Sequence, residues 1–323
     1  RVDLNARPPQ GTGNGFIGTG VEVTTVARVY DSFLTAQVRA YTSTHSQLQE
    51  FYRLAGQVDN LLADPQAGLT PGLQRFFNAV HGVANDPSSV PARQVMLGEG
   101  QALIDRFRYL GERLNNLGEG VNTQIRNSVN DINSYAQALA DINRRIVQTQ
   151  GAVSGQPAND LLDQRDALIG RLAERVSVTT VAQDDGALNV FIGNGQTLVL
   201  GANAYTLTAT ANPYDPTRLE ISYGTANVSD QLVGGSLGAT LDFRTRILDP
   251  ARNELGRLAT GLALSFNAQQ REGLNLNDAL GGDFFAAAAP LVRTRSSNTG
   301  TGSLSVTVSN GGALTASDYL ARY

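Results

Sequence analysis

The stretch LIDRFRYLGERLNNLGEGVNTQIRNSVNDINSYAQALADINRRI, from Leu103 to Ile146, decides the fold of this 323-residue chain. Its apolar residues recur at alternating steps of four and three, the heptad spacing of a helix that packs against other helices. They are Leu103, Phe107, Leu110, Leu114, Leu117 and Val121, then Ile125, Val129, Ile132, Ala136, Leu139, Ile142 and Ile146. One extra four-residue step at Ile125 shifts the phase, as a stutter does. The stretch therefore predicts one long helix between residues 92 and 150.

Glycines interrupt this helical pattern. They are Gly98, Gly100, Gly111, Gly118 and Gly120. Each costs about 1 kcal/mol relative to Ala in a helix interior, so the sequence leaves open whether the helix is continuous or breaks near the glycines. Because a seam of Leu, Val and Ile is more often an intramolecular core than a subunit interface, we expect most seam positions to be buried within the chain. Other parts of the protein or neighbouring subunits would cover the remainder.

Helical periodicity also surrounds this stretch. From Val29, apolar residues at three- and four-residue steps predict a helix that ends before Asp64 and Pro65. Its apolar positions are Phe33, Leu48, Phe51, Leu54, Val58 and Leu61. A shorter helix is predicted from Leu73 to Val83, and another begins at a cap formed by Asn159 or Asp160.

After Val176 the period changes to that of β-strands. Alternating residues and Gly-containing turns predict a small antiparallel sheet of about five strands, near residues 176–180, 188–192, 197–200, 205–210 and 219–223. From Leu237 helical spacing returns as far as Gly273, and Pro250 either kinks this helix or begins a second one. Near the end of the sequence, residues 304–308 and the following Asn-Gly pair predict the first hairpin of a further β-domain.

These patterns predict an α+β fold, in which an elongated bundle of long α-helices carries a small antiparallel β-subdomain and is followed by the start of a β-rich domain. The predicted parts are an extended entry loop (1–28), the N-terminal part of a helical rod domain (29–175), the β-subdomain (176–235), the returning helix and loop of the rod (236–287), and the truncated start of a β-rich outer domain (288–323).

The composition excludes several functions. A net charge of -4 and a pI near 5.3 provide no basic surface for phosphate backbones, so we expect no nucleic-acid partner. The chain has no Cys, and its 25 basic residues are all Arg, which removes thiol chemistry, Schiff-base chemistry and a P-loop lysine. The longest apolar run, Phe284 to Val292, contains Pro290 and is shorter than the ~18 residues of a membrane span, so we expect no membrane partner.

Two glycine motifs match the patterns of functional sites. Residues 13–18 read GNGFIG, which fits the dinucleotide-binding pattern, but no hydrophobic strand precedes them. Residues 234–238 read GGSLG, which fits the nucleophile elbow of serine hydrolases and would make Ser236 the nucleophile. In those hydrolases the histidine follows the serine, whereas His45 and His81 both precede it. We therefore interpret the first motif as a loop and the second as the start of a helix.

The remaining polar candidates do not form a recognisable site. His45 and His81 lie too far apart in the sequence for a histidine-based zinc site, and we interpret both as ordinary helix residues. The run Asp184-Asp185-Gly186 lacks the ligand spacing of a calcium loop and is better explained as a hairpin turn. Asp278 and Asp283 form no supported glycosidase pair. We expect no catalytic residue, no metal and no cofactor.

Several stretches resemble known flagellar proteins. FIGTGVEV (16–23) and VYDSFL (29–34) resemble the segment that follows the N-terminal helix in rod, hook and hook-associated proteins. DLLDQRD (160–166), DDGALNVFIGNG (184–195) and the region from GGSLGATLDF (234–243) to GGDFF (281–285) resemble the family of flagellar hook-associated protein 1, FlgK. The resemblance covers nearly all of residues 1–285. Ala239-Thr240 and Gln269-Gln270 are mild departures from the pattern of that family.

This resemblance implies a structural protein of the bacterial flagellum that forms the hook-filament junction and serves motility. It implies a central fragment that lacks both terminal helices of the family, secretion by the flagellar type III route, and an extracellular place between hook and filament. The implied partners are the hook protein, hook-associated protein 3, further copies in a ring, and an export chaperone that binds the missing C-terminal region. Two alternatives are another axial protein, such as a flagellin or hook-associated protein 3, and a secreted serine hydrolase that uses Ser236.

Overall fold

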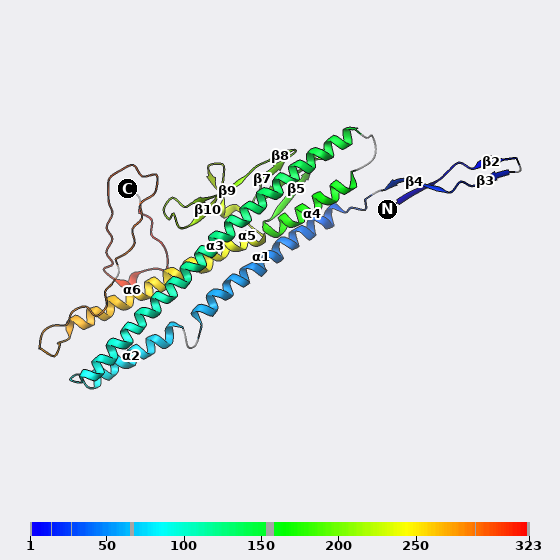
Figure 1. Ribbon diagram of the computed structural model, residues 1–323. Coiled ribbons are helices and arrows are strands. Elements are labelled where there is room, and N and C mark those ends of the chain that lie inside the picture. The colour runs from blue at the N-terminus through cyan, green and yellow to red at the C-terminus, as the bar shows by residue number, and fades with distance from the viewer. Residues whose placement is uncertain are drawn as a thin grey trace. The chain divides into compact units, whose positions relative to one another are not determined.

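The computed structural model describes residues 2–13, 15–26, 28–64, 68–152, 158–287 and 289–321 of the chain, and it has the predicted α+β class (Figure 1). Long helices dominate, and antiparallel strands form small sheets. The chain divides into two compact units. Unit 1 contains residues 1–49, 126–209 and 221–239, and unit 2 contains residues 50–125, 210–220 and 240–323.

The predicted long helix is continuous. Helix α3 runs from Val90 to Ala152 without a break at any of its glycines. Two of these glycines allow close packing, because a Cβ atom on Gly100 would lie 2.9 Å from the Phe284 ring and one on Gly118 would meet the Arg252 guanidinium. Gly98, Gly111 and Gly120 face open space. The glycines are therefore partly packing positions rather than break points.

The heptad seam of α3 forms the core, as predicted. Eleven of its positions are buried to below a tenth of their surface: Leu103, Leu110, Leu114, Val121, Ile125, Val129, Ile132, Ala136, Leu139, Ile142 and Ile146. Phe107 and Leu117 are half-buried. Burial of each such side chain contributes roughly 1.5–3 kcal/mol relative to exposure, which explains why a helix with so many glycines remains intact.

In unit 1, α3 packs against helix α4 through Ile142, Ile146 and Leu161. Helix α1 (Ser32–Leu62) begins where the Asp31 carboxylate accepts a 3.0 Å hydrogen bond from the backbone N–H of Leu34. Helix α4 spans Asn159–Arg175, and Ala158 rather than Asn159 or Asp160 occupies its cap position. An antiparallel sheet follows, with the order β5-β6-β7-β8. Its strands are β5 (Val178–Ala182), β6 (Leu188–Ile192), β7 (Gln196–Leu200) and β8 (Asn203–Ala204).

The predicted single sheet is in fact two. A separate three-stranded sheet has the order β11-β10-β9, with β9 at Leu207–Ala211, β10 at Leu219–Tyr223 and β11 at Ala226–Asn227. The Asp185-Gly186 turn joins β5 to β6, and Gly186 has φ +83°, which glycine adopts easily. Sequence periodicity located the strands but could not tell which strands pair, because pairing depends on long-range contacts.

The N-terminal residues, predicted to be an extended loop, form a ribbon of paired strands. Strand β1 (Val2–Ala6) pairs with β4 (Val21–Val26), and β2 (Gln10–Thr12) pairs with β3 (Gly15–Ile17). In the β1–β4 pair Leu4 faces Val23 and Ala6 faces Val21, so apolar residues share one face. The many Gly and Pro residues obscured this pairing in the sequence.

In unit 2, helix α2 (Leu69–Asn85), which starts earlier than predicted, packs on the first part of α3 through a cluster of aromatic rings. Phe76 is fully buried, and its ring centroid lies 5.2 to 5.8 Å from those of Phe266, Phe284 and Phe285. The buried amide of Asn267 binds the backbone of Phe284 and Phe285, with Nδ2 donating to the Phe285 carbonyl at 2.7 Å. This contact explains the position of the GGDFF sequence.

Pro250 begins a second helix, which was one of the two predicted outcomes. Helix α5 (Gly235–Phe243) leads into a π-helical turn, η2 (Arg244–Leu248), and then into α6 (Asp249–Glu272). The N–H of Asp249 donates to the carbonyl of Arg244, five residues back. A regular helix would press the Pro250 ring against the carbonyl four residues earlier, and the wider turn immediately precedes the proline.

The predicted hairpin near the end of the sequence is absent from the described part of this segment. Residues 289–321 contain no strand, and the Asn310 carboxamide instead caps a short 3-10 helix, η3 (Gly311–Ala313), by accepting from the Gly312 N–H. Isolated hairpins are at best marginally stable in water, so a strand there needs partner strands. The start of a β-rich domain at this point stays a prediction. Among the described helices, none combines the length and the apolarity of a membrane span.

Candidate functional site

The first half of α1 has its apolar residues on the outside. Leu34, Val38, Tyr41 and Leu48 are each more than half exposed, and Tyr41 reaches 67%. With His45, their spacing of four, three, four and three residues places them on one face of the helix. We call these five residues the α1 stripe.

The opposite face of the same half-helix is buried but polar. Arg39 is 7% exposed and Ser43 is 4% exposed. Arg39 donates from Nη2 to the Asp166 carboxylate at 2.7 Å and from Nη1 to the Thr180 hydroxyl at 3.3 Å. The helix is thus reversed relative to an ordinary surface helix, which buries its apolar face. An exposed apolar face, such as the α1 stripe, is typical of a surface that another chain segment covers.

A helix is the partner that the α1 stripe fits. Heptad spacing brings apolar side chains into register with the seam of a second helix, so that knobs from one enter holes of the other. A strand or a loop would not match this period. The α1 stripe therefore has the spacing of a helix-packing surface.

Asparagines on α3 attach the β-strands to the helix. In unit 1, the Asn133 amide accepts from the Leu207 N–H and donates to the Leu207 carbonyl, both at 2.8 Å. The Asn143 amide does the same with Leu188, at 3.2 and 2.8 Å, and also donates to Gly201. In this way a side-chain amide takes the place of a neighbouring strand.

Unit 2 repeats this asparagine contact and adds a buried ion-pair network. Asn122 accepts from the Leu219 N–H at 3.0 Å and donates to the Thr217 carbonyl at 2.7 Å. Close by, the Arg244 guanidinium donates to the Leu219 carbonyl and, at 3.1 Å, to the Glu220 carboxylate. Burial, followed by the charge of nearby Arg218, lowers the pKa of Arg244 despite the contact with Glu220. Buried, paired charges of this kind hold a fold in register.

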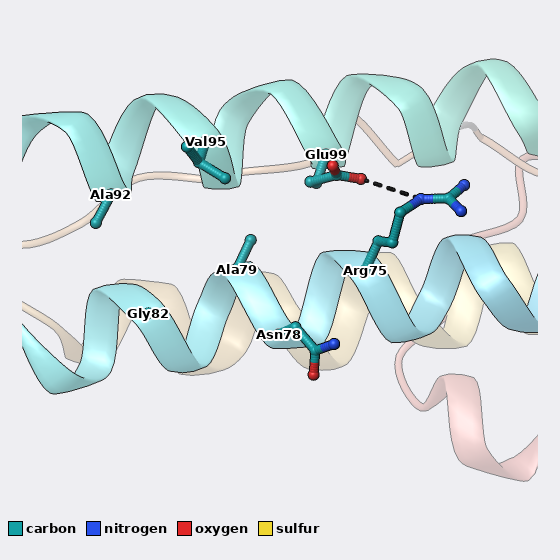
Figure 2. Close-up of a pocket in the computed structure, with 7 residues that line it drawn as sticks. All are labelled: Arg75, Asn78, Ala79, Gly82, Ala92, Val95 and Glu99. Atoms are coloured by element: carbon teal, nitrogen blue, oxygen red, sulfur yellow. Dashed lines mark ion pairs between the residues drawn. The ribbon is translucent and has the colours of Figure 1, made fainter.

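A groove lies between α2 and α3 in unit 2 (Figure 2). It has a volume of about 380 Å³, is open to solvent, and is lined by Arg75, Asn78, Ala79, Gly82, Ala92, Val95 and Glu99. The Arg75 and Glu99 side chains approach each other across it to 3.5 Å. An open groove with one half-exposed ion pair lacks the enclosed walls and convergent polar groups of a ligand site.

The GGSLG motif has a packing role in unit 1. Gly234 and Gly235 have φ values of +76° and +58°, and a Cβ atom on Gly235 would lie 2.2 Å from the backbone of Arg175. These glycines allow two backbone segments to touch. Ser236 lies in the first turn of α5 with its Oγ buried, while His45 is exposed on α1. A buried hydroxyl cannot be reached by a substrate, so this geometry gives the esterase hypothesis no support.

The other sequence candidates also have structural explanations. Residues 15–17 of the first glycine motif form strand β3 rather than a turn into a helix, and Asn14 lies outside the described residues. The Asp185 carboxylate accepts from the Ala187 N–H at 3.0 Å inside the β5–β6 turn. Asp283 is paired with Arg271 at 2.6 Å. Across the described segments, no cluster of His, Asp and Glu side chains could hold a metal ion.

Sequence reasoning missed the α1 stripe. It assigned Phe33 and Leu48 to the same apolar face as Leu54 and Val58, but Phe33 is 74% exposed whereas Val58 is buried. The heptad spacing of Leu34, Val38, Tyr41 and Leu48 was visible in the sequence. Periodicity, however, identifies an apolar face without saying whether the same chain covers it.

Comparison with known families and proteins gives a consistent result. Residues 55–285 match the family model described as "Flagellar hook-associated protein FlgK helical domain". Flagellar hook-associated protein 1 of Salmonella typhimurium is 38% identical over 312 residues, which cover 94% of this chain. The Escherichia coli protein of the same name is 35% identical over 94% of this chain, and that of Bacillus subtilis is 29% identical over 84%.

A solved structure shares the fold. The flagellar hook junction protein FlgK from Burkholderia pseudomallei superimposes with a TM-score of 0.80 at 33% sequence identity and covers 87% of this chain. The chain spans only about half of these proteins: 56% of the Salmonella relative and 52% of the Burkholderia chain.

Proposed function

Because the chain belongs to the flagellar hook-associated protein FlgK family, we propose that it is the central part of a structural protein that joins hook to filament in the bacterial flagellum. The relatives that it matches are named as hook-associated and hook junction proteins. In this role the protein transmits torque and bending through packed helices. It needs no catalytic group.

The α1 stripe is the observation that supports an assembly role. A freestanding soluble domain would lose stability by exposing Leu34, Val38 and Tyr41 while it buries Arg39 on the other face. In an assembled tube, a helix from the rest of the protein or from a neighbouring subunit can cover these residues. Each apolar side chain covered in this way contributes roughly 1.5–3 kcal/mol.

The proposed partners follow from the position of the junction. They are the hook protein on one side, hook-associated protein 3 on the other, and further copies of the same chain in a ring. Ring subunits meet through heterologous faces, so many modest contacts replace a single dominant one. We also propose extracellular localisation, secretion by the flagellar type III route, and an export chaperone as a further partner.

We further propose the domain division expected from the sequence, with boundaries after residues 28, 175, 235 and 287. The helices of the rod would then provide axial stiffness, and the strands of the β-subdomain would provide lateral contact. Expression of residues 176–235 alone tests this division. A folded product would support an independent β-subdomain, whereas an unfolded one would mean that the strands depend on the α3 asparagines for their stability.

Genetic complementation tests the function. The complete gene is expressed in a motile bacterium from which the resident FlgK gene has been deleted, and swimming and filament attachment are scored. We expect restored filaments and motility. Normal filaments on the deletion strain without the gene, or no rescue by a stably expressed full-length protein, would contradict the proposal.

Substitutions in the α1 stripe test the observation behind it. Tyr41→Asp places a charge on the stripe, and Ala40→Asp places the same charge on a neighbouring exposed position of α1 outside the stripe. We expect the first variant to abolish rescue and the second to retain it. Equal rescue by both would remove the stripe from the assembly surface while leaving the junction role intact.

A further inference from the structure

The N-terminal ribbon, described at residues 2–13 and 15–26, precedes a short link, residues 28–31, in which Val29 and Tyr30 are exposed. The described side chains of β1 and β3 are all exposed. In the link, Val29 is 86% exposed and Tyr30 is 47% exposed. Since a two-stranded ribbon has no core of its own, hydrophobic packing does not explain how it would hold a fixed direction.

Arg28, in the same link, is held firmly. Its side chain is 23% exposed, and its Nε donates to the Asp163 carboxylate at 2.7 Å while its Nη2 donates to Asp166. Asp163 and Asp166 are the two later carboxylates of the DLLDQRD sequence. Their spacing of three residues on α4 places them on one face, where a forked guanidinium can bind both.

Asp166 also ties the link to the rest of the unit. Its second oxygen accepts the 2.7 Å bond from Arg39, which is buried on α1 and also reaches Thr180 on β5. One carboxylate thus connects the link, α1 and α4. Burial alone would lower the pKa of Arg28, but the hydrogen bond and charge of Asp166, with those of Asp163, outweigh it and raise the pKa. Arg28, like other arginines, is charged at physiological pH and can act as an anchor.

We propose that Asp163 and Asp166 form a latch for Arg28 that fixes the direction in which the N-terminal ribbon leaves helices α1 and α4. Among the described side chains, the hydrogen bonds that tie the link to α4 are those of Arg28 with Asp163 and Asp166, so the direction of the ribbon depends on these bonds. Within the DLLDQRD sequence, the two later acids hold the link, and Arg165 bonds to the Gly186 carbonyl of the β5–β6 turn at 2.9 Å. This inference does not depend on the proposed role in the flagellum.

Spin labels test the latch directly. The chain has no cysteine, so Val23→Cys near the base of the ribbon and Arg171→Cys on the exposed side of α4 can be labelled without background. Pulsed electron paramagnetic resonance then gives the distribution of label distances. We expect a narrow distribution with the latch intact and one at least about twice as wide in Arg28→Ala.

A matched control separates the latch from a general loss of charge. Arg144 and Asp141 form an ion pair on the surface of α3, 3.1 Å long and about half exposed. Arg144→Ala should leave the distribution narrow. A broad distribution in the parent chain, or an Arg28→Ala distribution as narrow as the parent's, overturns the proposal.

Conservative variants test which atoms of Arg28 and Asp163 hold the ribbon. Arg28→Lys keeps the charge but cannot bridge two carboxylates with a planar fork, so an intermediate width is expected. Asp163→Asn removes one of the two negative charges that Arg28 bridges while leaving Arg39 its partner, and should widen the distribution with no loss of helix by circular dichroism. If Asp163→Asn and Arg28→Lys both match the parent, the fork is not what holds the ribbon, and the proposal fails.

Discussion

Two glycines of α3, Gly100 and Gly120, provide a sharp test of how this helix packs. A Cβ atom on Gly100 would lie 2.9 and 3.0 Å from two atoms of the Phe284 ring and 3.5 Å from the Phe76 ring. Around Gly120 there is nothing within 4 Å. We therefore compare Gly100→Ala with Gly120→Ala in the same helix.

The two variants should differ in their free energy of unfolding only by the cost of packing, because the gain in helix propensity is common to both. Both substitutions gain the same helix propensity, about 1 kcal/mol relative to Gly. Only Gly100→Ala also forces the Phe284 ring to move inside a packed aromatic cluster, and overpacking of this kind costs roughly 1–3 kcal/mol. Gly120→Ala should raise the free energy of unfolding by up to about 1 kcal/mol. The free energy of unfolding of Gly100→Ala should be roughly 1–3 kcal/mol lower than that of Gly120→Ala.

Urea denaturation followed by far-UV circular dichroism measures this difference, because the chain has no Trp to report by fluorescence. The slope of the free energy against urea must be equal in the two variants, so that the midpoints report stability alone. If both variants are stabilised equally, Phe284 is not packed against Gly100, and the reasoning is refuted.

Three further predictions concern the stability of the same chain. Asn133→Asp removes the donor to the Leu207 carbonyl and should cost roughly 1–3 kcal/mol in urea denaturation, while Asn130→Asp, at an exposed position on the same helix, should change little. Arg244→Ala removes one of the two arginines that contact the buried Glu220 carboxylate, which keeps Arg218 at 2.8 Å, and should cost roughly 1.5–3 kcal/mol in the same assay, whereas exposed Arg246→Ala should cost below about 1 kcal/mol. Gly235→Ala forces a side chain into the left-handed region and against the Arg175 backbone, so we expect it to abolish stable folding of unit 1, seen as lost amide-exchange protection in α4.

The sequence predicted the elements whose signal is local and periodic. The seam from Leu103 to Ile146 determined α3, because a long heptad pattern averages over single glycines. Asp185-Gly186 located the first hairpin turn, because glycine accepts the positive φ found there. The family resemblance rested on short motifs such as DLLDQRD (160–166), and the match over residues 55–285 confirmed it.

The sequence could not predict features that depend on which other segment packs against a given surface. An apolar stripe such as Leu34, Val38 and Tyr41 has the same period whether the chain covers it or leaves it exposed. Arg28 stands in a link that has no periodicity, so its two carboxylate partners on α4 became visible only in three dimensions. The expectation of no active site rests on residue types that the chain lacks or places apart, and it stays a prediction.

The asparagines of α3 explain why the β-strands of unit 1 dock at one position along the helix. A seam of Leu and Ile permits sliding by a helical turn, since similar apolar side chains recur every three or four residues. Sliding would separate Asn133 from Leu207 and Asn143 from both Leu188 and Gly201. Each backbone group left buried without a partner costs roughly 1–3 kcal/mol, so these amides together penalise every register but the observed one. The apolar seam therefore supplies most of the attraction, and the asparagines determine where on the helix the strands attach.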